Sequence, residues 1–143
     1  MDQVSEDKKG PITYVIVPVG IPGMGKTFFV ELLKKNLKDI NHKFSSVSSD
    51  EIRKECMDIL AQQNKDLTEE QLFSMTGKDA VNLFNERLSK LIKESDKLDC
   101  DAHIIYIDKN HPPNSFKNAL KLINESGKHL NMKIIAITPI VQS

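Results

Sequence analysis

Apolar residues follow two different spacings along this chain, and the spacings separate strands from helices. Four short runs are dominated by β-branched and other apolar residues, as is typical of strands. We predict strands over residues 12–19, 44–47, 102–107 and 132–137. The third of these runs is apolar at nearly every position, which predicts burial on both faces, as in the middle of a parallel sheet.

Between these runs, apolar residues recur every three or four positions, which predicts helices. The first helix follows the first strand and runs to about Asp39, and its apolar stripe is Phe28, Phe29, Leu32, Leu33, Leu37 and Ile40. Three more helices are predicted to begin at capping-box segments, over residues 48–51, 68–71 and 76–79. The last helix begins with Pro113 in its first turn and ends at Gly127.

Single strands that alternate with helices predict an α/β fold with a mostly parallel central sheet. Right-handed crossovers between parallel strands then place a ligand site at the carboxyl ends of the strands. With 143 residues, of which 39% are apolar, the chain is long enough for one domain with a core. We expect a disordered leader over residues 1–10 and one domain over residues 11–143.

The 20 basic and 20 acidic residues cancel, so no overall field attracts nucleic acid, although a local patch stays open. Only two of the basic residues are arginines, Arg53 and Arg87, and phosphoryl transfer commonly uses a guanidinium. Cys56 and Cys100 have no partners at metal-ligand spacing and are interpreted as reduced packing residues. The polar N-terminus and the lack of a long apolar run predict an intracellular protein, cytoplasmic or nuclear, without a membrane partner.

The segment GIPGMGKT matches the phosphate-binding pattern G-x-x-x-x-G-K-[ST] and lies between a predicted strand and a predicted helix. Its glycines let backbone N–H groups point at phosphate oxygens, Lys26 reaches the β and γ phosphates, and Thr27 offers a hydroxyl to Mg²⁺. We therefore predict that a nucleoside triphosphate and Mg²⁺ bind here. The predicted nucleotide-binding residues are Gly20, Ile21, Pro22, Gly23, Met24, Gly25, Lys26, Thr27 and Phe28.

Two carboxylates follow predicted strands, Asp50 in the first turn of a helix and Asp108 directly after a strand. A phosphate loop with two such carboxylates suits a phosphotransferase, because one carboxylate can accept a proton while the other orients Mg²⁺. Asp50 has a second interpretation, as a charge that merely favours a helix N-terminus. Arg53 either faces the same cleft one turn later or is solvated, and His111 has either a functional or a turn role. The other histidines, His42, His103 and His129, are interpreted as surface or packing residues.

Three segments together resemble the polynucleotide 5′-kinase branch of P-loop phosphotransferases, and in particular the kinase domain of fungal-type tRNA ligases. Residues 17–27 are similar to the strand and phosphate loop of that family, and residues 49–53 to its acidic motif, in which an Asp starts a helix. Residues 107–112 are similar to its D-[RK]-N motif. The resemblance extends over about residues 11–138 and implies a three-layer P-loop kinase fold.

The resemblance implies transfer of the γ-phosphate of ATP or GTP to the 5′-hydroxyl of an RNA end, as in tRNA splicing or RNA repair. In that case Lys26, Asp50 and Arg53 are the catalytic residues, with Asp50 as the general base and Arg53 on the phosphate of the acceptor strand. Thr27, Asp50 and Asp108 belong to the Mg²⁺ site, and Asn110 and His111 join Arg53 on the substrate side.

The family carries a lid after its fourth strand, and this sequence stops soon after that strand, at Ser143. A domain without a lid, or a piece of a longer kinase or ligase, is therefore expected. Two other functions remain open from the sequence, namely a P-loop kinase of a small metabolite and a nonenzymatic nucleotide-binding module.

Overall fold

The computed structural model describes residues 10–19, 23–109 and 116–138, in which strands alternate with helices. The elements along the chain are β1 (Ile12–Pro18), α2 (Gly23–Leu37), β2 (His42–Ser48), α3 (Ser49–Gln63), α4 (Glu69–Lys93), the short 3₁₀ helix η1 (Ser95–Lys97), β3 (Ala102–Asp108), α5 (Phe116–Ser126) and β4 (Met132–Ile137). The leader predicted over residues 1–10 lies outside the described residues, apart from Gly10.

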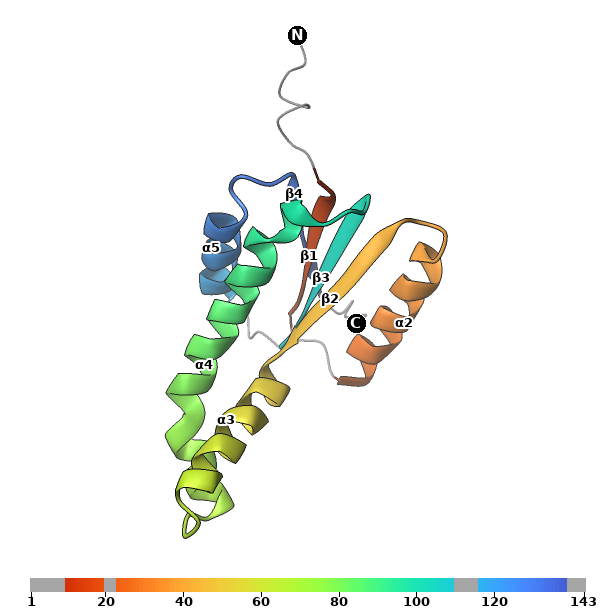
Figure 1. The fold of residues 1–143 in the computed structure, drawn as a ribbon. Helices are drawn as coiled ribbons and strands as arrows, with labels where there is room; N and C mark the ends of the chain where they lie inside the picture. The colour runs from red at the N-terminus through yellow and green to blue at the C-terminus, as the bar shows by residue number, and fades with distance from the viewer. Residues whose placement is uncertain (1–9, 20–22, 110–115, 139–143) are drawn as a thin grey trace.

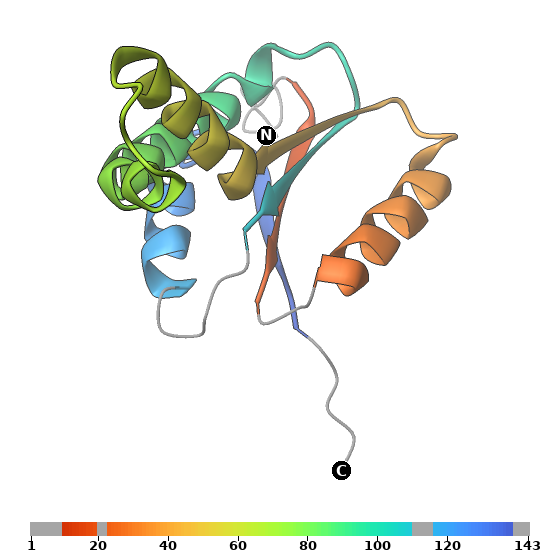
Figure 2. The ribbon, with the colours of Figure 1, turned by 90° about the horizontal axis from the view of Figure 1, so that it is seen from below.

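The four strands form one sheet in the order β2-β3-β1-β4, and every pair is parallel. Helix α2 covers one face of this sheet, and α5 and the C-terminal part of α4 lie on the other face, while α3 and the N-terminal part of α4 extend as a pair beyond the carboxyl ends of the strands (Figures 1 and 2). The predicted α/β class with a parallel sheet is confirmed. The predicted burial of residues 102–107 is confirmed as well, because β3 lies between two neighbours and is covered from both faces.

Each face of the sheet has its own apolar core. On the face of α4 and α5, the side chains of Leu88, Ile92 and Ile105 are fully buried, and each such burial stabilises the fold by about 1.5–3 kcal/mol. On the other face, α2 packs with Phe29, Val30, Leu33 and Leu37. The predicted stripe of α2 was wrong at Phe28, Leu32 and Ile40, which are 70%, 46% and 46% exposed. Among the described elements, α2 is the only helix on its face of the sheet, so only the side of it that faces the strands is covered (Figure 2).

The helix start predicted at residues 76–79 was wrong, because α4 runs without a break from Glu69 to Lys93. The true start is Thr68, which forms a complete capping box with Gln71. Thr76 is buried in the middle of the helix, and its hydroxyl donates to the carbonyl of Leu72 at 2.7 Å. A hydroxyl that bonds back to the preceding turn does not cap a new helix.

The remaining boundaries lie close to their predictions. Strand β2 is longer than predicted, and Ser48 caps α3 by accepting from the N–H of Glu51 at 3.3 Å. Helix α5 ends directly before Gly127, as predicted. A Cβ atom at this glycine would lie 2.4 Å from the sulfur of Met132, so any larger residue here would displace the Met132 side chain. The predicted start at Pro113 lies outside the described residues.

A buried polar network links three strands to η1 at the end of the sheet opposite to the strand carboxyl ends. The hydroxyls of Thr13 and Ser95 are 2.5 Å apart, and that of Ser95 lies 2.7 Å from Nδ1 of His103. Nε2 of the same ring lies 2.9 Å from the hydroxyl of Ser45. Burial, with a smaller effect of the Lys43 charge, lowers the pKa of His103 to about 4, so the ring is neutral.

The other histidines and the cysteines have the surface or packing positions that were predicted. His129 is half exposed near Asp96, and His42 contacts the carbonyl of Ile40. Cys56 packs against the larger core, and Cys100 contacts the carbonyl of Ala102; both thiols are free. Across residues 10–19, 23–109 and 116–138, no helix combines the length and the apolar character that crossing a membrane requires.

Candidate functional site

The carboxyl ends of the strands bring together three segments that are distant in sequence. Register pairs Ser48, the last residue of β2, with Asp108, the last residue of β3. Helix α3 starts directly after Ser48, so Asp50 lies in its first turn beside the end of β3. Helix α2 begins at Gly23, after the neighbouring strand β1. The predicted position of Asp50, in a first turn at a strand end, is confirmed.

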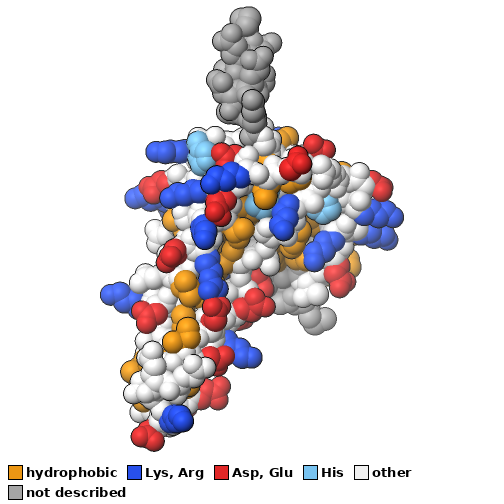
Figure 3. All heavy atoms as spheres, viewed as in Figure 1, with side chains coloured by type: hydrophobic (Ala, Val, Ile, Leu, Met, Phe, Trp, Pro, Cys, Tyr) orange, Lys and Arg blue, Asp and Glu red, His pale blue; other side chains and the backbone are white. Residues whose placement is uncertain are grey.

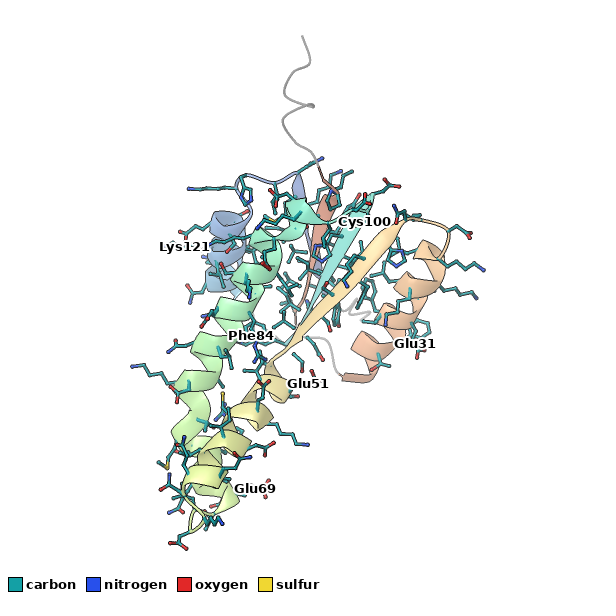
Figure 4. The ribbon with its side chains drawn as sticks, in the orientation of Figure 1. Glu31, Glu51, Glu69, Phe84, Cys100 and Lys121 are labelled. Carbon is teal, nitrogen blue, oxygen red and sulfur yellow. The ribbon has the colours of Figure 1, made fainter. Side chains whose placement is uncertain are left out.

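Thr27, Asp50 and Asp108 line one open hollow of about 520 Å³, which we call the α2–α3 hollow. Its lining residues are Thr27, Val30, Glu31, Lys34, Phe44, Ser46, Asp50, Tyr106 and Asp108. Figure 4 shows the two flanking helices, with Glu31 on α2 and Glu51 in the first turn of α3. Two strands and two helices therefore contribute oxygen donors to the same space.

The N-terminus of α2 borders this hollow. The helix has 15 residues and no acidic residue in its first turn, so its dipole favours an anion at this end. Residues 23–26 of the predicted phosphate loop form the start of α2, although their side chains, including that of Lys26, lie outside the described residues. Gly20, Ile21 and Pro22 also lie outside them. Phe28 is 70% exposed and does not line the hollow.

The oxygen donors of the α2–α3 hollow fit Mg²⁺. The lining carries the hydroxyls of Thr27, Ser46 and Tyr106 and the carboxylates of Glu31, Asp50 and Asp108, and such hard ligands are those that this cation prefers. Within the described part of the chain, no three His, Cys, Asp or Glu residues form a group that could hold a metal ion by themselves. Mg²⁺ does not require such a group, because it usually keeps several waters and shares one or two protein carboxylates with substrate phosphates.

Tyr106 is a site residue that the sequence reasoning missed. Its hydroxyl is buried, has no hydrogen-bond partner among the described residues, and belongs to the lining of the α2–α3 hollow. Burial, with the nearby charge of Asp108, raises the pKa of Tyr106 to about 12, so the group is a neutral hydroxyl. The available signal was its place two residues before Asp108, since alternate residues of a strand share a face.

Arg53 does not line the α2–α3 hollow. It lines a second hollow of about 730 Å³, which we call the α3–α4 hollow and which Asp50 also borders. The guanidinium of Arg53 lies over the ring of Phe73, 3.7 Å from its centroid, and one Nη atom donates to the carbonyl of Phe73. Its Nε atom is buried, whereas the residue as a whole is partly exposed.

The complete lining of the α3–α4 hollow is Asp50, Arg53, Lys54, Met57, Asp58, Glu69, Glu70, Leu72 and Phe73. Apolar side chains from both helices lie among four carboxylates and two cations. Because Asp50 belongs to both hollows, it stands at the boundary between the space that Thr27 borders and the space that Arg53 borders.

The other predicted substrate residues, Asn110 and His111, lie outside the described residues. Arg87, the second arginine, forms two hydrogen bonds with the carboxylate of Glu55, at 2.8 and 2.6 Å. These bonds lower the pKa of Glu55 and raise the pKa of Arg87. Neither residue lines the α2–α3 hollow or the α3–α4 hollow.

Comparison of the chain with protein-family models, with curated proteins and with solved structures found no match. The function is therefore inferred from the two hollows and from the sequence motifs.

Proposed function

We propose that this protein is a P-loop kinase that uses a nucleoside triphosphate, ATP or GTP, and Mg²⁺ to phosphorylate the 5′-hydroxyl of an RNA end. The observation that carries this proposal is the shared α2–α3 hollow. Thr27, which ends the phosphate-loop motif, and the carboxylates of Asp50 and Asp108 meet there at the N-terminus of a helix. The RNA acceptor comes from the resemblance of three segments to polynucleotide kinases.

The boundary position of Asp50 suggests how the two substrates meet. The triphosphate occupies the α2–α3 hollow, where the N-terminus of α2 attracts its phosphates. The acceptor enters from the α3–α4 hollow and places its hydroxyl at Asp50. Bound Mg²⁺ neutralises charge on the phosphates.

In the transfer step, the acceptor oxygen forms a bond to the γ-phosphorus while the bond from that phosphorus to the β-γ bridging oxygen breaks. Asp50 accepts the proton of the acceptor hydroxyl, and the nucleoside diphosphate leaves. Arg53 binds the phosphate that follows the terminal nucleoside of the acceptor, because it lies one turn after Asp50 on the same helix.

A specific observation favours a second candidate, the kinase of a small metabolite. Four carboxylates and only two cations line the α3–α4 hollow, and this balance attracts a compact neutral or cationic acceptor more than a polyanion. The third alternative, a nonenzymatic nucleotide-binding module, requires the same α2–α3 hollow but no acceptor.

A labelled-phosphate assay separates these functions. The γ-labelled triphosphate, ATP or GTP, is offered with 5′-hydroxyl RNA, with the same RNA already 5′-phosphorylated, with 5′-hydroxyl DNA and with a panel of hydroxylated metabolites. The proposal expects Mg²⁺-dependent label on the 5′-hydroxyl RNA alone or above DNA. Label on a metabolite supports the second candidate, and triphosphate binding without transfer supports the module. Unchanged triphosphate affinity of the Lys26→Ala variant in calorimetry would overturn all three.

A further inference from the structure

Neutral groups, and not carboxylates, hold the guanidinium of Arg53. Its flat face lies on the ring of Phe73, and one Nη atom donates to the backbone carbonyl of the same residue. Asp58, Glu69 and Glu70 line the same hollow, and Glu69 lies near the tip of the α3–α4 pair (Figure 4). Within the described residues, however, Arg53 forms no ion pair with any carboxylate.

This mode of holding leaves the charge available for a ligand. Stacking on an aromatic ring uses the face of the guanidinium, whereas its N–H donors point outward in the plane. A bidentate carboxylate would instead occupy two donors and cancel the charge. Phe73 therefore fixes the plane of Arg53. Within the described residues only one of its five N–H donors has a partner, and because the Nε–H is buried, the donors open to a ligand are those of the Nη atoms.

The space beside the guanidinium is also shaped by Gly77 of α4. A Cβ atom at this position would lie 3.3 Å from an Nη atom of Arg53, which is a tight contact. Glycine in a helix interior costs about 0.5–1 kcal/mol relative to alanine, so the local sequence is not optimised for the helix alone. Phe73 and Gly77 lie one turn apart on α4; the ring of Phe73 contacts the guanidinium, and a Cβ atom at Gly77 would press on the same group.

We propose that Phe73, with room provided by Gly77, is a positioning residue that holds Arg53 for an acceptor that carries a phosphate next to its terminal nucleoside. This inference rests on the proposed function, because it assigns Arg53 to the acceptor. It goes further in two respects. It names the residues that act through Arg53, and it makes selection for the acceptor phosphate depend on an aromatic ring of α4.

The test compares two acceptors, a nucleoside 3′-monophosphate and the same nucleoside without phosphate. Phe73→Ala is expected to raise KM for the phosphorylated acceptor about 10-fold, since it loosens but does not remove the charged contact. KM for the triphosphate and for the bare nucleoside should stay unchanged. Phe73→Tyr keeps the ring and should behave like the parent. Gly77→Ala should shift the same KM in the same direction, by a smaller factor.

Met75→Ala is the matched control, because Met75 and Phe73 are exposed to the same extent, 56% and 55%, and belong to the same helix. Met75 lies outside the α3–α4 hollow. Its removal should leave both acceptors unaffected, and circular dichroism with thermal unfolding checks that each variant is folded. In the Arg53→Ala background, Phe73→Ala should add nothing, because its effect acts through the guanidinium.

An equal effect of Phe73→Ala on both acceptors, or an effect that adds fully to that of Arg53→Ala, would overturn the inference. If the parent protein transfers phosphate to no acceptor, the proposed function fails, and calorimetry with the two acceptors then decides. Tighter binding of the 3′-monophosphate, lost in both Arg53→Ala and Phe73→Ala, would support the inference without catalysis. No preference for the phosphate in the parent would reject it.

Discussion

The two arginines of the chain both join α3 to α4, but they do so in opposite ways. Arg87 reaches from α4 to Glu55 of α3 and forms a bidentate ion pair. Arg53 reaches from α3 to α4 and rests on the ring and carbonyl of Phe73. The first guanidinium is neutralised where it lies, whereas the second keeps its charge beside Asp50. One contact joins the helix pair through paired charges, and the other leaves a charge for which we propose a ligand.

The surroundings of the two arginines differ in burial, although carboxylates outnumber cations in both hollows. Charged side chains of both signs are interspersed over the α3–α4 pair (Figure 3). Arg87 lies with Lys90 in a separate hollow of about 370 Å³, where Glu51, Glu55 and Glu94 outnumber the cations. Such pairs at a half-exposed surface contribute little stability and are screened by salt. Arg53, in contrast, has a buried Nε atom and a fixed plane.

The largest effect is expected at the end of α3 that Arg53 shares with Asp50. Asp50→Asn should lower kcat for RNA phosphorylation about 10²–10⁴-fold, because a general base acts mainly in the transition state. Triphosphate affinity in calorimetry should stay nearly the same. The matched variant Glu55→Gln changes a carboxylate of the same helix at the Arg87 contact and should keep the parent rate.

Thermal unfolding must accompany this comparison, since the loss of a favourable charge at the start of α3 costs about 0.3–1 kcal/mol. A folded Asp50→Asn protein with the parent rate would exclude this residue as the base, and Asp108 would then be the next carboxylate to change.

His103, at the other end of the sheet, provides a contrast with the two charged arginines, because its buried ring is neutral. Its pKa is about 4 in the folded protein and about 6.5 in an unfolded chain. Between these values the unfolded chain binds more protons, so stability is complete above pH 6.5 and falls as the pH decreases toward 4. The loss should reach about 3 kcal/mol. Denaturant titrations from pH 7 to pH 4 measure it.

A His103→Gln variant keeps hydrogen-bonding groups but cannot take up this proton. Its stability at pH 7 should be lower than that of the parent, because the network with Ser95 and Ser45 is disturbed. The part of the pH dependence between 6.5 and 4 that belongs to His103 should disappear. An unchanged slope in this variant would assign the titration to another group.

Removal of Arg53 and removal of Arg87 should have different effects on activity. Arg53→Ala should lower kcat/KM for an RNA acceptor about 10–100-fold, as expected for a lost charge-assisted contact of about 1.5–3 kcal/mol. Arg87→Ala should leave it unchanged, because that charge is already paired with Glu55. Single-turnover measurements of the two variants with the RNA acceptor provide the test. Equal losses in the two variants would remove the distinction between them.

Local patterns were sufficient for most of the fold. Strand β4 covers the predicted residues 132–137. Its apolar, β-branched composition is a local signal, so the prediction did not depend on distant contacts. The prediction of a helix start at residues 76–79 was wrong because the same four residues are compatible with a helix start and with a helix interior. The capping box at Thr68 decides between the two, since a helix that has begun there simply continues. Burial of Thr76 then satisfies its hydroxyl within the helix.

The candidate site was predictable as far as strand ends determine it. Asp50 and Asp108 converge because parallel strands end at one edge of the sheet. The contact between Arg53 and Phe73 was not predictable, because it joins two helices and depends on how far one slides along the other. Packing of complete side-chain surfaces sets that distance, and no motif of either helix records it.

The smallest effect is expected for the ion pair of Arg87 with Glu55. This prediction tests the Arg87 half of the comparison between the two arginines. Arg87→Ala, Glu55→Ala and the exchanged pair Arg87→Glu with Glu55→Arg should all unfold near the parent temperature, because both side chains are about half exposed. The difference among them should shrink further in 1 M salt, where charges are screened beyond about 3 Å. The exchanged pair should recover whatever the single variants lose, since the two charges still face each other. A large loss of stability that persists in high salt would contradict this prediction, as would a loss of phosphate transfer in Arg87→Ala. In either case Arg87 would serve more than the helix pair, and the distinction between the two arginines would no longer hold.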